Sequence, residues 1–424
     1  MLKRVVIVGA GVVGCSCAVE LLERGFDVVV LERARNVGAE GSGRSMGSLR
    51  LQGRLVPEVP LARVALERWI ALGERTDIEL VRGGNLYVAQ LADELPLLER
   101  LELEAHATGL ESVRMVGSAE ACDIAPFRPE AVVGGLYGPD DAHCNPRMAV
   151  GALAALAQEG GADLRFGVTV EGLARAADST LTGVHVAGGE LLRADSVVVA
   201  AGVGSPRLLR SVGLDLPIKE MLVSQAETAA TGPLFQATLR GRRFSARQRP
   251  TGELVLGAGL DARVDRLVSL DDLRRLRQWL PRYRVHRRSI RLRFGTRATR
   301  FRHLVTGQPG RDRELVYLAP NQSLIDRSYT WLREAVVPTL PPVARYWTGY
   351  VDHTLDGLPV IDHPPRVDNL VVAAGFSGHG LAIAPGVGLA VADLVATGES
   401  RLDLSAFRLA RFDEAELGMP HQFI

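Results

Sequence analysis

The chain has 424 residues, more than one ordinary hydrophobic core accommodates, which favours two domains or one elaborate one. Hydrophobic residues make up 47% and charged residues 23%, the profile of a soluble globular protein, and the net charge of +1 excludes a global field that would draw the chain to nucleic acid or an acidic membrane. No run of about 18 unbroken apolar residues occurs, so we expect no membrane span. The four cysteines form no C-x-x-C pair, and a reducing cytoplasm is the default compartment.

The first 32 residues predict a strand–helix–strand unit. Residues 4–8 are a β-branched run suited to a buried parallel strand, residues 12–24 have helical spacing, and residues 27–31 form a second apolar run that ends at Glu32. Gly25 ends the helix before the second strand. Together these segments predict the βαβ opening of an α/β domain.

The downstream segments alternate between parallel and antiparallel patterns. Short alternating runs with turn signals between residues 217 and 260 predict antiparallel hairpins. Further helices are expected at 60–75, 93–108, 147–159, 271–280, 325–336 and 384–397, and further strands near 163–170, 195–200 and 368–374.

This order of elements predicts an α/β fold in two domains. A Rossmann-like cofactor domain is expected to consist of the discontinuous segments 1–85, 145–215 and 345–424. The second domain is expected to be α+β, with a mainly antiparallel sheet, and to comprise residues 86–144 and 216–344. Within it, we expect residues 281–322 to be an insertion that forms a lid or an interface.

The turn after the first strand carries a dinucleotide-binding fingerprint, Gly9-Ala10-Gly11-Val12-Val13-Gly14. The first glycine allows the tight turn, the second lets the backbone approach a pyrophosphate, and the third lets helix and strand pack closely. The N-terminus of the helix offers N–H groups and a partial positive charge to phosphates. An acid at Glu32 binds ribose hydroxyls and disfavours a 2′-phosphate, so the unit predicts NAD or FAD rather than NADP.

Three further segments favour flavin over NAD. Residues 41–50 are dense in small residues, which let backbone and hydroxyl groups pass close to a ligand. Residues 197–202 are a strand that ends in a tight turn. The sequence Gly375-Phe376-Ser377-Gly378-His379-Gly380 precedes a predicted helix, whose N-terminus can face the flavin ring.

On these motifs the chain resembles the D-amino-acid oxidase superfamily of flavoproteins, which includes glycine oxidase, sarcosine oxidase and D-amino-acid dehydrogenase. The resemblance covers almost the whole chain and includes Trp347-x-Gly349 and Thr354-x-Asp356-Gly357-x-Pro359. Residues 47–49 and 141–146 are most similar to the flavin subunits of opine oxidases and D-hydroxyproline dehydrogenases.

The resemblance implies that FAD lies extended in the first domain, with its ring against the antiparallel sheet of the second. It implies oxidation of an amine, an imino acid or an N-substituted or D-amino acid by hydride transfer to flavin N5, which needs no strong general base. No cysteine stands where a covalent flavin bond is expected, so we expect FAD to be non-covalent. The residues that the resemblance assigns to the cofactor are Gly9, Gly11, Val12, Val13, Gly14, Glu32, Arg33, Ser42, Gly43, Arg44, Ser45, Met46, Gly47, Val170 (through its backbone, to the adenine), Ala201, Gly202, Gly375, Gly378, His379, Gly380 and Leu381.

The chain departs from the family directly after W-x-G. Many amino-acid-oxidising members carry Arg-Pro there, and that arginine clamps the substrate carboxylate; here residues 350–353 read Tyr-Val-Asp-His, and Asp352 would repel a carboxylate. Either another arginine replaces the clamp, or the substrate is an amine bound without it. Residues 263–302 contain fourteen arginines, which a solvated basic face or a subunit contact also explains; the candidates among them are Arg291, Arg293 and Arg297.

Four residues are candidates for contact with the substrate: Arg50, Tyr350, His353 and His379. Arg50 can equally be a surface charge, and His379 can equally be structural or touch only the flavin. No His/Cys/Asp cluster has the spacing of a metal site. Three alternatives to a self-sufficient amine oxidase stay open: a flavin subunit that passes electrons to a partner protein, a protein that holds FAD without turnover, and an NAD-linked dehydrogenase. A homo-oligomer also stays open.

Overall fold

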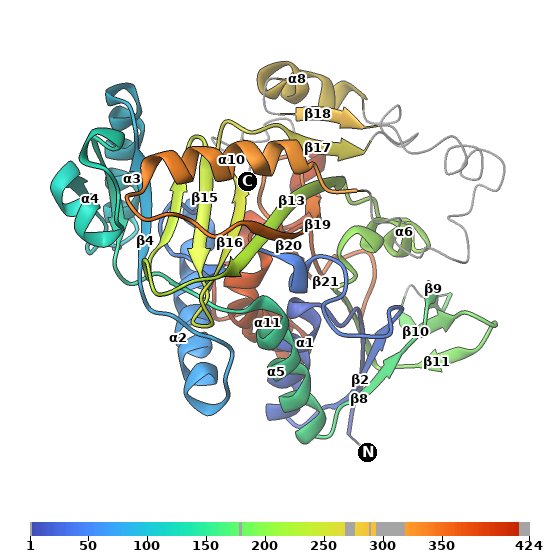
Figure 1. Cartoon of the computed structure of the whole chain (residues 1–424). Coiled ribbons are helices and arrows are strands. Elements are labelled where there is room, and N and C mark those ends of the chain that lie inside the picture. Colours follow the sequence, from blue (N-terminus) through green and yellow to red (C-terminus); the bar gives the residue numbers. More distant parts are fainter. Residues whose placement is uncertain (1, 178–179, 268–275, 288–289, 294–318, 415–424) are drawn as a thin grey trace.

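The computed structural model describes residues 2–177, 180–267, 276–287, 290–293 and 319–414 (Figure 1). Its first layer is a six-stranded sheet in the order β20-β21-β12-β1-β2-β8, in which only the pairing of β20 with β21 is antiparallel. The strands are β1 (Arg4–Val8), β2 (Asp27–Glu32), β8 (Asp163–Phe166), β12 (Ser196–Val199), β20 (Val360–Asp362) and β21 (Leu370–Ala374). Strands from both ends and the middle of the chain therefore meet in one sheet, which confirms a Rossmann-like domain built from discontinuous segments.

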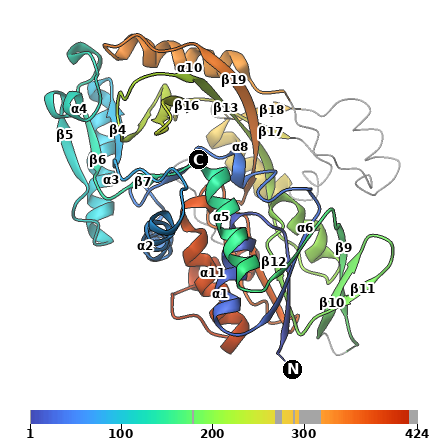
Figure 2. The same ribbon diagram turned by 60° about the horizontal axis from the view of Figure 1, so that its bottom comes forward.

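Helices α1 (Val12–Glu23), α5 (Pro146–Glu159) and α11 (Gly380–Thr397) cover this sheet, and α11 packs against both α1 and α2 (Val59–Arg75) (Figure 2). A small antiparallel sheet of β9 (Val170–Arg175), β10 (Leu181–Val186) and β11 (Leu191–Arg193) shares a second apolar core with the parallel sheet. The short helix α6 (Ser205–Arg210) follows β12.

Helix α11 begins at Gly380, four residues before the predicted start at 384, and carries Pro385 inside it. Pro385 has no N–H to donate to the carbonyl of Leu381, one turn earlier. The indole Nε1–H of Trp69 donates to that carbonyl instead, at 3.1 Å. The helix is long and apolar enough to cross a membrane, but 72% of it is buried inside the protein, as in the core helix of a globular domain.

The second layer is a ten-stranded sheet in the order β18-β17-β13-β16-β15-β14-β4-β6-β5, with β19 also paired to β13. Most of its pairings are antiparallel, as predicted; β14 with β4 and β17 with β18 are parallel. Its strands are β4 (Asn85–Ala89), β5 (Arg114–Gly117), β6 (Gly134–Gly138), β13 (Lys219–Ala230), β14 (Thr238–Gly241), β15 (Phe244–Gln248), β16 (Glu253–Ala258), β17 (Val264–Leu267), β18 (Ile290–Arg293) and β19 (Val343–His353).

The register of the strand pairs shows which residues lie on each face of this sheet. One face carries an apolar row that packs under α10 (Gln322–Ala335), with members Leu86, Leu239, Ala246, Leu256 and Ala226. Because side chains alternate along a strand, the adjacent row lies on the opposite face. That row reads Tyr87, Arg240, Ser245, Gly257 and Gln225, and it faces the first domain, because Met46 lies against Gly257 and Arg50 contacts Tyr87.

The remaining described elements connect these layers. Helices α3 (Leu95–Ala107) and α4 (Ser118–Ile124) contact β6, and the two-residue strands β3 (Ser48–Leu49) and β7 (Ala142–His143) pair with each other. The helix expected at 271–280 is described only from Leu276, as α8 (Leu276–His286), and most of the expected insertion at 281–322 lies outside the described residues. The domain boundary expected at 345 falls inside β19, which pairs with β13 from Lys219 to Thr228, so we place that boundary near residue 354.

Candidate active site

The glycine fingerprint forms a turn whose backbone leaves no room for side chains. Gly9 has a φ of 110°, and a Cβ on Gly14 would overlap the carbonyl oxygen of Gly9. The hydroxyl of Ser42 accepts the N–H of Val12 at 3.0 Å, which brings the small-residue segment onto the N-terminus of α1. The N–H groups of Val13 and Gly14 have no partner within the helix, as at any helix start, and are available to phosphate oxygens.

Glu32 closes the same site from the end of β2. Its two carboxylate oxygens accept the N–H groups of Ala10 and Ala34, at 2.8 and 2.7 Å, which hold it beside the fingerprint turn. Arg33 pairs with Glu40 rather than with Glu32. The N-terminus of α1 can bind a pyrophosphate, and Glu32 stands at the position where an acid binds the ribose of an adenine dinucleotide. The residues present therefore fit FAD.

Gly14→Ala is expected to remove FAD binding, because the added methyl group must displace the carbonyl of Gly9 at the centre of the turn. The ratio of flavin to protein absorbance in the purified variant measures the loss. Gly151→Ala is the matched control: it lies in α5, nothing stands within 4 Å of its added Cβ, and alanine favours helix by roughly 0.5–1 kcal/mol. A flavin content equal to wild type in Gly14→Ala would contradict the assignment.

The segment after Ser42 is held between the two domains. Trp347 donates through its indole Nε1 to the carbonyl of Arg44 at 3.2 Å, and a Cβ on Gly349 would stand 3.2 Å from the same oxygen. Trp347 and Gly349, which belong to β19, therefore hold the segment that follows Ser42 against this strand. Gly43 accepts from Arg147, and the carbonyl of Met46 accepts from the buried Arg247.

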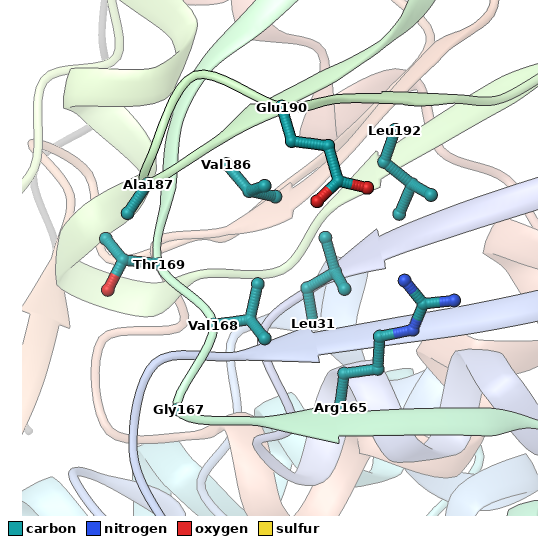
Figure 3. A pocket seen from close by; sticks show the side chains of 9 residues that line it. All are labelled: Leu31, Arg165, Gly167, Val168, Thr169, Val186, Ala187, Glu190 and Leu192. Atoms are coloured by element: carbon teal, nitrogen blue, oxygen red, sulfur yellow. The ribbon is translucent and has the colours of Figure 1, made fainter.

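The adenine side of the site is less regular than predicted. The strand expected near 163–170 ends at Phe166 as β8, and β9 begins at Val170, so Gly167, Val168 and Thr169 form a loop between the two strands. The Val170 carbonyl accepts from Arg207 at 2.7 Å, and its contact with adenine stays a prediction. A pocket of about 210 Å³ lies beside this loop (Figure 3). Leu31 lines it, and because side chains alternate along a strand, the neighbouring Glu32 points to the opposite face. We therefore assign this pocket no ligand.

The C-terminal glycine segment forms a second tight turn. Gly375 and Gly378 have φ values of 80° and 89°, and Ser377, at 51°, is held by hydrogen bonds to Thr354 and to Gly375. Ala201, which follows β12, lies against Gly9, since a Cβ on Gly9 would approach the Ala201 Cα to 3.2 Å; contact of Gly202 with the cofactor stays a prediction. The three glycine segments therefore converge on one edge of the parallel sheet.

The sequence suggested that Asp352 would repel a substrate carboxylate, but in the structure Asp352 bonds to the backbone of the C-terminal turn. Its carboxylate accepts the N–H of Gly375 at 2.8 Å, and its carbonyl accepts that of Ser377 at 3.2 Å. Burial raises the pKa of Asp352 to about 6. The end of β19, which carries Tyr350 and His353, thus fastens the 375–377 turn, and the Nδ1 of His353 lies 2.6 Å from the carbonyl of Thr354. A substrate contact for either residue stays a prediction.

Arg50, which follows β3, lies in a buried cluster of cationic side chains against the facing sheet. Its Nη1 makes all three of its described hydrogen bonds, to the carbonyls of Gln52 and Gly53 and to the hydroxyl of Tyr87 at 2.9 Å. Its Nε and Nη2 have no hydrogen-bond partner among the residues that the structure describes. The Arg240 guanidinium lies 5.3 Å from the centre of the Tyr87 ring, and the Nε of Arg54 donates to the carbonyl of Arg50.

These charges change the acidity of their neighbours. Burial raises the pKa of Tyr87, but Arg240, Arg50 and Arg54 outweigh it, and the pKa falls below its usual value. Burial lowers the pKa of Arg54 and of Arg240 to about 10, so both stay charged at neutral pH. Burial also raises the pKa of Asp141 to about 7, although Asp141 accepts the N–H of Leu51 at 2.6 Å. The cluster therefore has more positive than negative charge.

Glu58 connects this cluster to the C-terminal turn. It is fully buried, one oxygen lies 3.4 Å from the Nη1 of Arg54, and the carboxylate lies 3.0 Å from the Nδ1 of His379. Burial raises the pKa of Glu58, but His379, Arg54 and Arg50 outweigh it and hold the pKa below its usual value. Burial lowers the pKa of His379 despite this carboxylate. Arg50 and His379, which lie 329 positions apart, thus meet through Arg54 and Glu58.

Sequence reasoning missed Arg54, Glu58, Tyr87, Arg240 and Asp141. Arg54 and Glu58 are close to Arg50 in the chain, but residues 50–55 form no helix, so no periodic spacing pointed to them. Nothing in a strand of alternating residues singles out Tyr87 or Arg240. Arg291 pairs with Asp265 at 2.5 Å, as the surface interpretation of the arginine-rich segment expects; the side chain of Arg293 and all of Arg297 lie outside the described residues.

Within the described ranges, no group of three or more His, Cys, Asp or Glu side chains could hold a metal ion. A parallel sheet with a dinucleotide turn at one edge, facing an antiparallel sheet with a polar, cationic face, defines a two-domain flavin-dependent oxidoreductase. The family model described as FAD dependent oxidoreductase matches residues 4–298 and 282–394, and the chain belongs to that family. FAD is its cofactor.

Similarity to individual proteins supports this family assignment. The chain is 27% identical to glycine oxidase from Geobacillus kaustophilus, over 96% of both chains, and 24% identical to an opine oxidase subunit from Agrobacterium tumefaciens, again over 96% of both. The structure of L-amino acid deaminase from Proteus vulgaris superimposes with a TM-score of 0.85 at 19% identity, covering 97% of each chain. The chain is thus an FAD-dependent oxidoreductase of the D-amino-acid oxidase superfamily, similar to enzymes of amino and imino acids.

Proposed function

We propose that the protein oxidises the C–N bond of an amino acid or imino acid whose carboxylate is bound by Arg50. The observation that carries the proposal is the edge of Arg50 that has no described partner: Nε and Nη2 lie in a buried cationic cluster beside the His379 turn. Two parallel N–H donors match the two oxygens of a carboxylate. This arginine takes the role that the position after Trp347-x-Gly349 leaves vacant in the sequence.

The position of each residue determines its role in this reaction. Arg50, supported by Tyr87, orients the carboxylate, and Arg240 and Arg54 add positive charge around it. The sheet face and Met46, whose Sδ lies near Gly257, exclude water from the substrate. FAD, when bound, supplies a two-electron acceptor for the hydride of the substrate carbon. The fingerprint turn, Glu32 and the His379 turn hold that cofactor.

Anaerobic addition of amino acids, imino acids and N-alkyl amino acids to the purified yellow protein tests this function. At least one carboxylate-bearing compound is expected to bleach the flavin absorbance, and acid precipitation is expected to release the FAD because no covalent bond holds it. A panel in which no compound bleaches the flavin would leave a protein that holds FAD without turnover.

A second candidate is a flavin subunit that passes its electrons to a partner protein. The similarity to the Agrobacterium tumefaciens opine oxidase chain, whose name makes it one subunit of an enzyme, supports this candidate. Turnover with an artificial dye but not with oxygen, together with co-purification of a second chain, would favour it over an oxidase. We propose the cytoplasm as the compartment, because all four cysteines are free thiols.

A further inference from the structure

We propose that Glu58 and His379 form a carboxylate–imidazole pair that accepts the proton of the substrate ammonium group, so that the amine is neutral when it is oxidised. The inference rests on the proposed function and adds a proton acceptor to it. An amine can release hydride from its α-carbon only when its nitrogen lone pair is free, so an ammonium substrate must first lose a proton. The N–H bond of the ammonium breaks, and an N–H bond to the Nε2 of His379 forms.

The geometry fixes which ring nitrogen is available. Nδ1 lies 3.0 Å from the Glu58 carboxylate, which has no proton to give and must accept, so Nδ1 carries the hydrogen and Nε2 holds a lone pair. Glu58 is fully buried, whereas the side chain of His379 keeps 13% of its surface exposed. Because Nδ1 faces Glu58, Nε2 on the other side of the ring points away from that carboxylate. His379 is also the N-cap of α11, in the turn that borders the cofactor.

The charges around the pair act on both the acceptor and the donor of this proton. Burial disfavours the imidazolium form of His379, Glu58 stabilises it, and Arg54 and Arg50 oppose it. The same two guanidinium groups disfavour a second cation, the ammonium, on a substrate held by Arg50. Because burial lowers the pKa of His379, the ring is neutral and its lone pair is free before the substrate binds. Among the described residues, the Glu58 carboxylate bonds to His379 and Arg54. Its role is therefore to position the imidazole and to stabilise the positive charge of the protonated ring.

The pH dependence of flavin reduction in Glu58→Gln and His379→Gln tests the pair. Glutamine at 58 can still accept from Nδ1 but lacks the charge, so the acid limb of the rate profile is expected to move to lower pH by about one unit or more. His379→Gln is expected to lose that limb. Glu94→Gln is the matched control, since Glu94 is a buried glutamate of the second domain and its variant should keep the wild-type profile. Equal rate losses at every pH in both variants would overturn the proposal.

A second readout needs no turnover and no variant of Glu58. In histidine-labelled wild-type protein, the ¹⁵N spectrum is expected to show His379 as the neutral Nδ1–H tautomer, and as imidazolium once 2-methylalanine binds, an amino acid with no α-hydrogen to lose. A ring that stays neutral in that complex would overturn the pair. Binding of propionate, which has the carboxylate but no amine, distinguishes a failure of the proton acceptor from a failure of the proposed function. If propionate binds and Arg50→Met abolishes that binding, the carboxylate site stands even when the proton acceptor fails; if neither ligand binds, the proposed function itself fails.

Discussion

Replacing Arg50 by methionine is expected to lower the apparent second-order rate constant for flavin reduction by a carboxylate substrate by roughly 100-fold or more. Truncating one member of a buried, hydrogen-bonded charge pair costs about 2–5 kcal/mol, and each 1.4 kcal/mol is a factor of ten. The loss should appear mainly in substrate affinity, because Arg50 makes its contact with the carboxylate before and during oxidation alike. Stopped-flow reduction over a range of substrate concentrations separates affinity from the limiting rate.

The control for this variant is Arg100→Met, an arginine on the exposed face of α3. It changes the same charge and leaves the site untouched, so it should reduce flavin at the wild-type rate. Flavin content and the far-ultraviolet spectrum of Arg50→Met should also match wild type, because Arg50 bonds to Gln52, Gly53 and Tyr87 and not to the fingerprint turn. An unchanged substrate affinity in Arg50→Met would remove Arg50 from the site.

The second large effect is expected on stability, at Asp356. This buried aspartate pairs with Arg411, Oδ2 to Nε at 2.7 Å and Oδ1 to Nη2 at 3.1 Å, and also accepts from Thr354 and from the N–H of Leu358. Asp356→Asn leaves the buried guanidinium without its counter-charge. Breaking a buried ion pair from one side costs about 3–5 kcal/mol, so the melting temperature should fall by roughly 5 °C or more.

Asp163→Asn is the matched comparison for that loss. Asp163 pairs with Arg165 near the surface, with side chains about half exposed, and exposed pairs contribute about 0–1 kcal/mol. Its melting temperature should stay close to that of wild type. Equal melting temperatures for Asp356→Asn and Asp163→Asn would show that the motif Thr354-x-Asp356-Gly357-x-Pro359 does not fasten the C-terminal segment to the parallel sheet.

The cofactor half of the fold could be predicted because its signals are local. The run of strand, glycine turn, helix and acid from Arg4 to Glu32 is contiguous in the chain, and the structure has each element within one residue of the predicted bounds. The same holds for the turn at 375–380, where only the start of the helix was misplaced: α11 begins at Gly380 rather than at 384, and Trp69 donates to the carbonyl that Pro385 leaves without a partner in the helix.

The substrate side could be predicted only in part, because it is assembled from distant segments. Arg50 and His379 were identified from the cofactor motifs that they end, but their link through Glu58 depends on how α2 packs against α11. Tyr87 and Arg240 are neighbours only because β4 and β14 pair in parallel, across 153 positions of sequence. Asp352 was interpreted as a charge facing the substrate because sequence gives no sign of the backbone N–H groups that it accepts.

The central claim is that this flavoprotein recognises its substrate through a carboxylate held by Arg50. The most direct measurement compares anaerobic flavin reduction by an amino or imino acid with reduction by the corresponding amine that lacks the carboxyl group. We expect the acid to bleach the flavin in wild type and to lose this ability in Arg50→Met, and the amine to react slowly with both proteins. Equally fast bleaching by the amine and the acid in wild type would contradict the account.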